Sequence, residues 1–304
     1  MRLGIAVDSR RCMGCWCCFT ACKDEHCGFA SKLSAAQPMM GQRWIDVREW
    51  ERGDSSRRVK SASVATLCAH CEDPSCLKAA KDGAVYKRDD GVVIIDPEKS
   101  KGQKAIVDAC PIKVIFWNEE LQIPQKCTMC AELLDDPEYL AYLGDPALRM
   151  PRCVEACPNK VLYYGDLDDP NSEIAKIVAS QRNTQLEALK GKETRVKWLN
   201  VPTVFLAGTV YQPAELDEVL IGAKVTLKCD ETGETWETES NHFGDWEVEW
   251  LPKNKKIDIT IEAPGYKLAV YTATTDKDHY VDMTYMIPDK PSAPSSASYA
   301  EMRG

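Results

Sequence analysis

The sequence predicts an α+β protein with two domains, a cysteine-rich domain over residues 1–200 and a small antiparallel β-sandwich over residues 201–287. Two observations lead to this prediction. Twelve of the fifteen cysteines recur in closely spaced groups within the first 157 residues. From about residue 201 these groups end, and apolar residues alternate with polar ones at the period of a half-buried strand. With 304 residues, the chain is long enough for two hydrophobic cores.

The cysteine groups have the spacing of iron–sulfur ligands. The first group reads C-x2-C-x2-C-x3-C. In bacterial ferredoxins the fourth cysteine of such a run binds the cluster of the other run. Pairing the groups in this way gives three complete sets, and we predict that each holds one 4Fe–4S cluster. The sets are Cys12, Cys15, Cys18 and Cys157 (set 1), Cys22, Cys127, Cys130 and Cys153 (set 2), and Cys68, Cys71, Cys76 and Cys110 (set 3).

A fourth set is missing as a whole. Where the same spacing would place its cysteines, the chain has Ala80, Ser100, Gln103 and Ile106. Under cross-ligation these four positions would serve a single cluster, so one site is erased completely while its neighbour is kept. The pattern therefore predicts two nested ferredoxin-like units, with the inner unit over residues 61–125.

Disulfides and zinc are the alternative explanations for the cysteines. Disulfides are typical of secreted chains, and we expect no secretory segment before the first group. Zinc sites use paired cysteine knuckles rather than three thiolates on one short loop. Three further cysteines, Cys17, Cys27 and Cys229, have no partner at ligand spacing, and we expect them to be small packed hydrophobes.

Local patterns predict the elements of the cysteine-rich domain. Alternating apolar residues over 3–7 predict a strand that enters the first cysteine loop. Residues 83–86 and 91–96 predict two strands joined by a tight turn. Capping residues at 170–173 predict a helix that begins there and ends near Gly191.

The C-terminal part has strand patterns throughout. Turn residues separate three alternating runs at 223–229, 246–250 and 257–261. Trp246 and Trp250 are expected to face the core, with Glu247 and Glu249 facing outward. The pattern resembles transthyretin-like or carboxypeptidase-regulatory-like domains. Residues 288–304 are rich in Pro, Ser and Ala and predict a flexible tail.

Composition excludes several classes of function. The formal net charge of −9 argues against nucleic acid as a partner, and Arg57-Arg58-Val59-Lys60 is expected to be a solvated face or a partner contact. No stretch has the apolar length of a membrane span, so we expect no direct membrane insertion. A cytoplasmic location is expected unless a partner subunit carries an export signal for both. His26, His70, His242 and His279 fit no catalytic spacing and are expected to be structural, so the chain is not expected to be an enzyme by itself.

Residues 1–200 resemble the iron–sulfur subunits of dimethyl sulfoxide reductase-family molybdopterin oxidoreductases. Within that family, the three sets followed by a β-sandwich are similar to the branch of pyrogallol–phloroglucinol transhydroxylases. The matching segments include Cys12-Met13-Gly14-Cys15, Ala21-Cys22-Lys23, Cys68-Ala69-His70-Cys71, Gly83-Ala84-Val85-Tyr86, Asp96-Pro97-Glu98-Lys99, Lys126-Cys127-Thr128-Met129-Cys130 and, for the branch, Gly41-Gln42-Arg43-Trp44 and Trp117-Asn118-Glu119-Glu120.

The resemblance implies an electron-transfer subunit of a heterodimer or a higher assembly. Its partner would be a large catalytic subunit that carries molybdenum on two pterin guanine dinucleotides and acts on hydroxylated aromatics. Resorcinol hydroxylases and catechol dehydroxylases are related families that the resemblance also allows. Two competing hypotheses are a scaffold, in which the clusters mainly hold the fold together, and an independent ferredoxin.

The resemblance also implies a linear order of clusters. Set 1 would lie nearest the catalytic subunit, followed by set 2, then the erased site, and then set 3. Loss of the third position would leave set 3 stranded, so we expect a longer gap before it than between sets 1 and 2.

Overall fold

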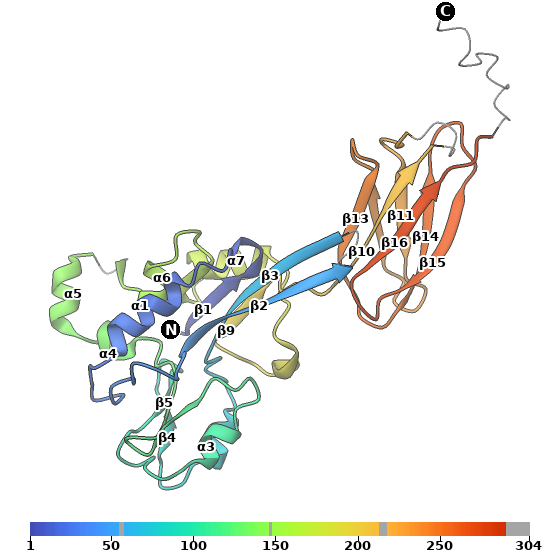
Figure 1. The fold of residues 1–304 in the computed structure, drawn as a ribbon. Helices are drawn as coiled ribbons and strands as arrows, with labels where there is room; N and C mark the ends of the chain where they lie inside the picture. Colours follow the sequence, from blue (N-terminus) through green and yellow to red (C-terminus); the bar gives the residue numbers. More distant parts are fainter. Residues whose placement is uncertain (55–57, 146–147, 213–217, 290–304) are drawn as a thin grey trace, which may run out of the picture. The chain divides into compact units, whose positions relative to one another are not determined.

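The structure is a computed structural model that describes residues 1–54, 58–145, 148–212 and 218–289 (Figure 1). The chain mixes helices and strands and divides into two compact units. The first unit holds residues 1–50 and 62–201, and the second holds residues 51–61 and the chain from 202 onward. In the described part of the chain, no helix is long and apolar enough to cross a membrane. The predicted tail lies, beyond Asp289, outside the described residues.

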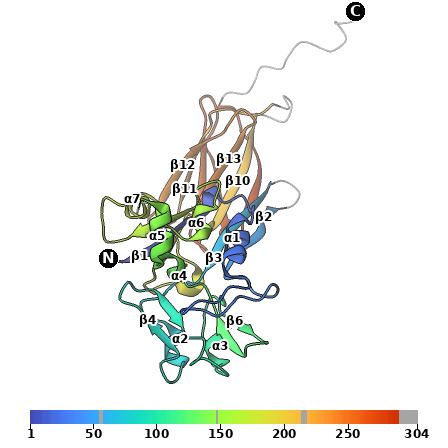
Figure 2. The ribbon, with the colours of Figure 1, turned by 90° about the vertical axis from the view of Figure 1, so that its left-hand side faces the viewer.

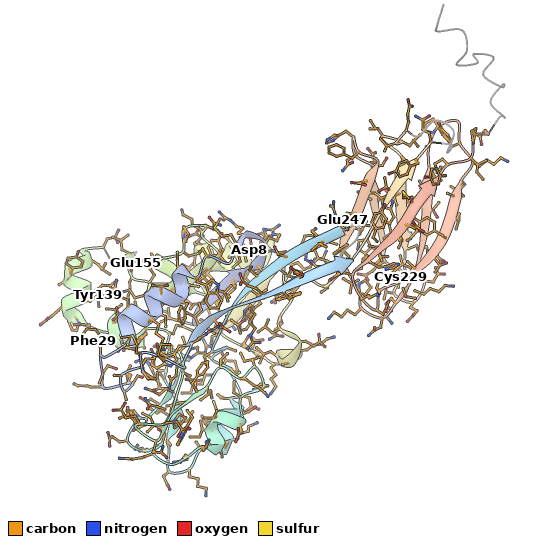
Figure 3. All side chains as sticks on the ribbon, viewed as in Figure 1. Asp8, Phe29, Tyr139, Glu155, Cys229 and Glu247 are labelled. Atoms are coloured by element: carbon orange, nitrogen blue, oxygen red, sulfur yellow. The ribbon has the colours of Figure 1, made fainter. Side chains whose placement is uncertain are left out.

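A three-stranded sheet organises the first unit. Its central strand β1 (Leu3–Asp8) pairs antiparallel with β8 (Leu162–Asp166) and parallel with β9 (Val196–Leu199). All six residues of β1 are buried, because strands cover both of its edges and α7 (Glu173–Ser180) packs on the sheet. The polar side chain of Asp8 is buried with them and is labelled in Figure 3.

The helix expected to reach Gly191 is shorter than predicted and ends at Ser180. Gln181 is already extended, and the chain then forms an isolated bridge between Asn183 and Leu199 of β9. Backbone pairing with β9 therefore replaces helical hydrogen bonding after Ser180. A local helix pattern does not predict this pairing, because its partner strand comes later in the chain.

The remaining elements of the first unit are short. Two short hairpins lie beside the short helices α2 and α3, and this group lies below α1 and α6 in the view of Figure 2. The helices are α1 (Cys17–His26), α2 (Ser75–Ala79), α3 (Ala105–Asp108), α4 (Ala131–Leu134), α5 (Pro137–Leu143) and α6 (Arg152–Glu155). The hairpins pair β4 (Val85–Lys87) with β5 (Val93–Ile95), as predicted, and β6 (Phe116–Asn118) with β7 (Ile123–Gln125).

A long hairpin, β2 (Ile45–Asp54) and β3 (Arg58–Leu67), belongs to both units. Its base is part of the first unit, and its tip at residues 51–61 is part of the second. The sequence-based domain boundaries placed the whole hairpin in the first domain. The tip belongs to the second unit through contacts with residues after 202. Spacing and composition do not predict contacts between segments so far apart in the chain.

The second unit contains two sheets that share one apolar cluster. Their strand orders are β13–β10–β16 and β12–β11–β14–β15. The prediction of a wholly antiparallel arrangement was wrong, because the first strand β10 runs parallel to the last strand β16. The strands are β10 (Val204–Tyr211), β11 (Lys224–Lys228), β12 (Thr235–Glu239), β13 (Asp245–Leu251), β14 (Lys256–Glu262), β15 (Ala269–Thr274) and β16 (His279–Tyr285).

The predicted alternation on β13 holds at its start and breaks at its end. Trp246 is 2% exposed and belongs to the apolar cluster, as expected. Trp250 has a φ of +59° and is only half-buried, and Leu251 takes the core position instead. A residue in the left-handed region interrupts the two-residue period of a strand, so the side chains after it change faces.

The two glutamates of β13 do not face solvent freely. Glu247 pairs with Arg58 at 2.8 Å and with Lys60 at 2.5 Å, and Lys60 also pairs with Glu249 (Glu247 is labelled in Figure 3). The basic run at the hairpin tip is therefore neither a solvated face nor free for a partner at these two positions. Its first residue, Arg57, lies outside the described residues.

Candidate iron–sulfur centres

The segments of α1 and α6 supply four of the eight cysteines of sets 1 and 2. Cys18 and Cys22 lie four residues apart on α1, which places them on one face of that helix. Cys153 on α6 and Cys157 just beyond it have the same separation, and the two helices pack against each other. Each helix thus supplies one cysteine to set 1 and one to set 2.

Set 1 lines a cavity near the surface. Cys12, Cys15, Cys18 and Cys157 all contribute to its wall, and the cavity has about 340 Å³ of empty space. Cys15 is exposed, so this edge of the set reaches solvent. Burial raises the pKa of the Cys18 thiol to about 12, with repulsion from Cys12 as a smaller cause.

Set 2 is the most deeply buried of the three. Each of its four cysteines, Cys22, Cys127, Cys130 and Cys153, is at most 9% exposed. Burial, followed by repulsion from other members of the set, raises the pKa of Cys22, Cys130 and Cys153 well above the usual value for a thiol. Cys22, Cys127 and Cys153 also belong to one apolar cluster.

Set 3 lines a second cavity, of about the same size as that of set 1. Cys68, Cys71, Cys76 and Cys110 all contribute to its wall, and it has about 370 Å³ of empty space. Burial raises the pKa of Cys71 to about 11 and that of Cys76 to about 12. The two cavities, each lined by four thiols and otherwise mainly by apolar residues, offer the same ligand chemistry.

The erased fourth site is filled by apolar side chains. Ile106 is fully buried, and it forms one cluster with Cys76, Ala80 and Cys110. Cys76 and Ala80 are four residues apart around α2, and Ile106 and Cys110 are four residues apart around α3. The inner unit therefore repeats the arrangement of α1 and α6, with an apolar side chain in place of one cysteine of each pair.

The other two erased positions are also occupied by the chain itself. Gln103 accepts a hydrogen bond from the backbone N–H of Lys81 at 2.8 Å and donates to the carbonyls of Lys81 at 3.3 Å and Lys99 at 2.8 Å. Ser100 is fully buried. A carboxamide and a hydroxyl replace thiols here, and neither is a usual ligand of a 4Fe–4S cluster.

The expected order of the sites stays a prediction. Cys127 of set 2 and Cys68 of set 3 lie in the same large apolar cluster. The erased positions Ala80 and Ile106 lie in another cluster, together with Cys76 and Cys110 of set 3. This packing favours an erased site on the far side of set 3 over one between sets 2 and 3.

All fifteen cysteines are free thiols in the structure. Cys12, Cys15 and Cys18 lie on one short segment and line one cavity, an arrangement that suits one face of a cube better than the paired knuckles of a zinc site.

His26 contacts set 2, which the sequence did not predict. Its Nδ1 lies 3.0 Å from Oε1 of Glu132, and its Nε2 lies 3.6 Å from Sγ of Cys130. Burial alone would raise the pKa of Glu132, but hydrogen bonding from His26 lowers it. The available signal was that His26 follows Cys22 by four residues on α1 and so shares its face. His242 and His279 belong to the second unit.

The three cysteines outside the sets differ from one another. Cys229 is fully buried in the core of the second unit, as expected of a small hydrophobe (Figure 3). Cys17 and Cys27 are only half-buried, which corrects the expectation that they are packed. Cys17 adjoins the set 1 cysteines in sequence but does not line their cavity.

Cys17→Ser is expected to leave the iron content unchanged, because Cys17 is not on the wall of the set 1 cavity. Cys18→Ser is the matched variant, since Cys18 is the next residue on α1 and does line that cavity. Iron analysis of the two purified proteins checks this. Loss of iron in the Cys17 variant with retention in the Cys18 variant would reverse their roles.

Comparison with known proteins agrees with this site. A family model described as a 4Fe–4S dicluster domain matches residues 59–167. The chain is 34% identical over 286 residues to the pyrogallol hydroxytransferase small subunit of Pelobacter acidigallici, covering 93% of this chain and 97% of that one. It is 30% identical to a tetrathionate reductase subunit of Salmonella typhimurium, covering 72% of this chain and 81% of that one. It is 29% identical to a putative dimethyl sulfoxide reductase iron-sulfur subunit of Halobacterium salinarum, covering 65% and 78%.

The fold, the cysteine sets and these matches define an iron–sulfur electron-transfer subunit of a multi-subunit oxidoreductase. The chain belongs to the iron–sulfur subunits of the dimethyl sulfoxide reductase family of molybdopterin oxidoreductases, as the sequence motifs indicated. Its similarity to the pyrogallol hydroxytransferase small subunit extends over nearly the whole of both chains.

Proposed function

We propose that the twelve cysteines of sets 1, 2 and 3 hold three 4Fe–4S clusters. The observation that carries this proposal is the pair of similar cavities, each lined by the four cysteines of one predicted set. The shared burial of the set 2 thiols supports the third cluster. The apolar filling around Ile106 supports the limit of three. In this proposal the first unit consists of two nested ferredoxin-like units, and the second unit is a β-sandwich.

The residues of the chain support a series of neighbouring sites. When bound, such clusters supply one-electron transfer. Cys18 and Cys22 are separated by four residues of α1, a rise of about 6 Å, which holds sets 1 and 2 next to each other. Cys127 and Cys68 share one packed cluster, which holds sets 2 and 3 together. Because the set 2 cysteines are buried, water is excluded from the site that lies next to both set 1 and set 3.

We further propose that the chain serves a molybdenum enzyme that acts on hydroxylated aromatics. The full-length match to a pyrogallol hydroxytransferase small subunit supports this choice over the other chemistries named among its relatives. The partner would be a large catalytic subunit that carries molybdenum on two pterin guanine dinucleotides, in a heterodimer. The chain would supply no catalytic residue of its own.

A mainly structural role for the clusters is the second candidate. Cysteines of all three sets contribute to, or pack against, the main apolar cluster of the first unit, so a cluster held there also holds the core together. The two roles differ in one respect. Rapid reduction of the clusters by the aromatic substrate of the complex indicates electron transfer, whereas clusters that stay oxidised during turnover indicate a scaffold.

The anaerobically purified protein is expected to contain about twelve iron atoms per chain, because three sets of four cysteines remain and each cube holds four irons. It is expected to copurify with a large molybdenum-containing subunit. Iron, sulfide and molybdenum analysis of the complex checks both statements. A content near sixteen would mean that the erased site still binds a cluster, and purification without a large subunit would contradict the proposed assembly.

A further inference from the structure

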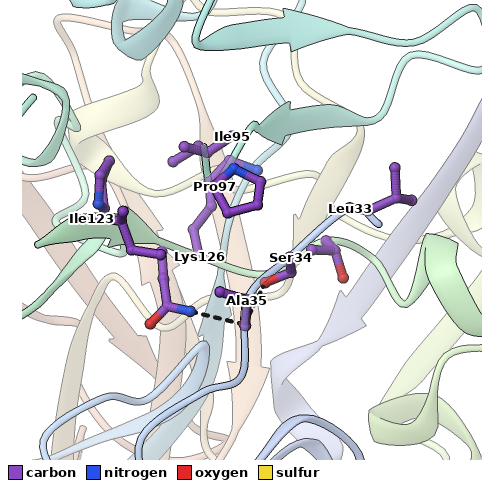
Figure 4. A pocket seen from close by; sticks show the side chains of 10 residues that line it. Leu33, Ser34, Ala35, Ile95, Pro97, Ile123 and Lys126 are labelled. Carbon is purple, nitrogen blue, oxygen red and sulfur yellow. Dashed lines mark hydrogen bonds between the residues drawn. The ribbon is translucent and has the colours of Figure 1, made fainter. Parts of the chain in front are cut away.

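Lys126 is a buried cation at the junction of sets 2 and 3. It is 3% exposed. Its ammonium donates hydrogen bonds to the carbonyl of Cys127, at 3.0 Å, and to the carbonyl of Val93 on β5. Lys126 also lines a small cavity together with Leu33 and Ile95 (Figure 4). A buried ammonium is costly unless an opposite charge compensates it.

No carboxylate in the described part of the chain forms an ion pair with Lys126. Both carbonyls that accept from its ammonium belong to the surroundings of the two sets. Cys127 is a cysteine of set 2, and Val93 lines the set 3 cavity. The ammonium therefore lies between the two sets, where bound thiolates would compensate its charge.

His70 provides a second donor at the same junction, on set 3 alone. Its Nδ1 accepts a hydrogen bond of 3.0 Å from the backbone N–H of Val93, the residue whose carbonyl binds Lys126. Because Nδ1 accepts this hydrogen bond, the neutral ring carries its proton on Nε2. Nε2 is buried, has no partner within the described residues, and belongs to a side chain that lines the set 3 cavity.

We propose that Lys126 and His70 raise the reduction potentials of the clusters held at this junction, with Lys126 acting on the clusters of both set 2 and set 3 and His70 acting on that of set 3 alone. Reduction adds one negative charge to a cluster, and a fixed cation or N–H donor in a low-dielectric site favours the more negative form. This inference rests on the proposed three-cluster assignment. Neither residue would bind iron. Both would act on the clusters through charge or hydrogen bonding.

The test is an anaerobic redox titration of the complete complex, followed by electron paramagnetic resonance. Lys126→Gln keeps a hydrogen-bond donor and removes the charge. At a fixed ambient potential it is expected to lower the reduced-to-oxidised ratio of two clusters at least tenfold, which corresponds to about 59 mV for a one-electron couple. His70→Phe is expected to shift one of those two clusters only. Lys126→Arg keeps the charge and is expected to leave every potential unchanged.

Lys99→Gln is the matched control, because the Lys99 side chain is 58% exposed and solvent screens its charge. Full iron content with unchanged potentials in Lys126→Gln would overturn the inference. A shift of the potentials in Lys126→Arg as large as that in Lys126→Gln would also overturn it. If Lys126→Gln loses iron, full iron in Lys126→Arg supports the role of charge, and loss of iron in both variants contradicts it. The iron content and copurification of the unaltered protein test the proposed function separately.

Discussion

Removing the iron is expected to unfold the first unit and leave the second unit folded. The largest apolar cluster of the first unit includes cysteines of every set, among them Cys18, Cys68 and Cys127. Without iron these thiols would lose the bonds that tie distant segments together, so the free energy of cluster binding is part of the free energy of folding. Among the described residues, Cys229 is the one cysteine in the core of the second unit, and it belongs to no set.

Hydrogen exchange before and after anaerobic chelation measures this directly. Amides of β1 in the first unit are expected to lose their protection, and amides of β14 in the second unit are expected to keep theirs. Protection of β1 that survives complete loss of iron would show that the apolar core is sufficient for folding. Loss of protection in β14 would show that the second unit depends on the clusters.

Arg52→Ala is expected to lower the unfolding free energy of the second unit by about 3 kcal/mol, because it leaves the half-buried Asp278 carboxylate, 16% exposed, without its charged partner. The Arg52 side chain is 3% exposed and binds Asp278 through two nitrogens, at 2.9 Å and 3.1 Å. It also donates to the carbonyl of Thr203 at 2.7 Å. The same Asp278 carboxylate accepts a hydrogen bond from the backbone N–H of Phe205 at 2.9 Å. Native-state hydrogen exchange in β10 measures the change.

Arg58→Ala on the same hairpin tip is the control for Arg52→Ala. The Arg58 side chain is 41% exposed, so the loss of its pair with Glu247 is expected to cost less than about 1 kcal/mol. The double variant Arg52→Ala with Asp278→Ala is expected to cost less than the sum of the two single changes, because the residues share one interaction. Equal costs for Arg52→Ala and Arg58→Ala would contradict a special role for the buried pair.

The sequence predicted the parts of the structure that depend on short spacing. Ligand spacing in cysteine runs is local, and the rule that pairs the runs comes from the chemistry of a four-ligand cube. Those two facts were enough to group cysteines that the structure brings together, such as Cys12 with Cys157. The inner strands 85–87 and 93–95 followed in the same way from alternation around a turn.

The parts that the sequence did not predict depend on contacts between distant segments. The parallel pairing of β10 with β16, the early end of α7 at Ser180 and the membership of residues 51–61 in the second unit are all of this kind. The order of the sites is a different case. It was carried over from the family rather than argued from the residues, and the packing around set 3 favours another order.

The way in which the fourth site is filled makes its loss hard to reverse. Changing Ile106 back to cysteine would remove part of a fully buried side chain from its core. Changing Gln103 would break the three hydrogen bonds that join two loops. Neither change brings any gain until all four thiolates are present, since a cube needs its full ligand set. Single substitutions toward a ligand set at these positions therefore lead only through less stable proteins, so the packing itself opposes a cluster there.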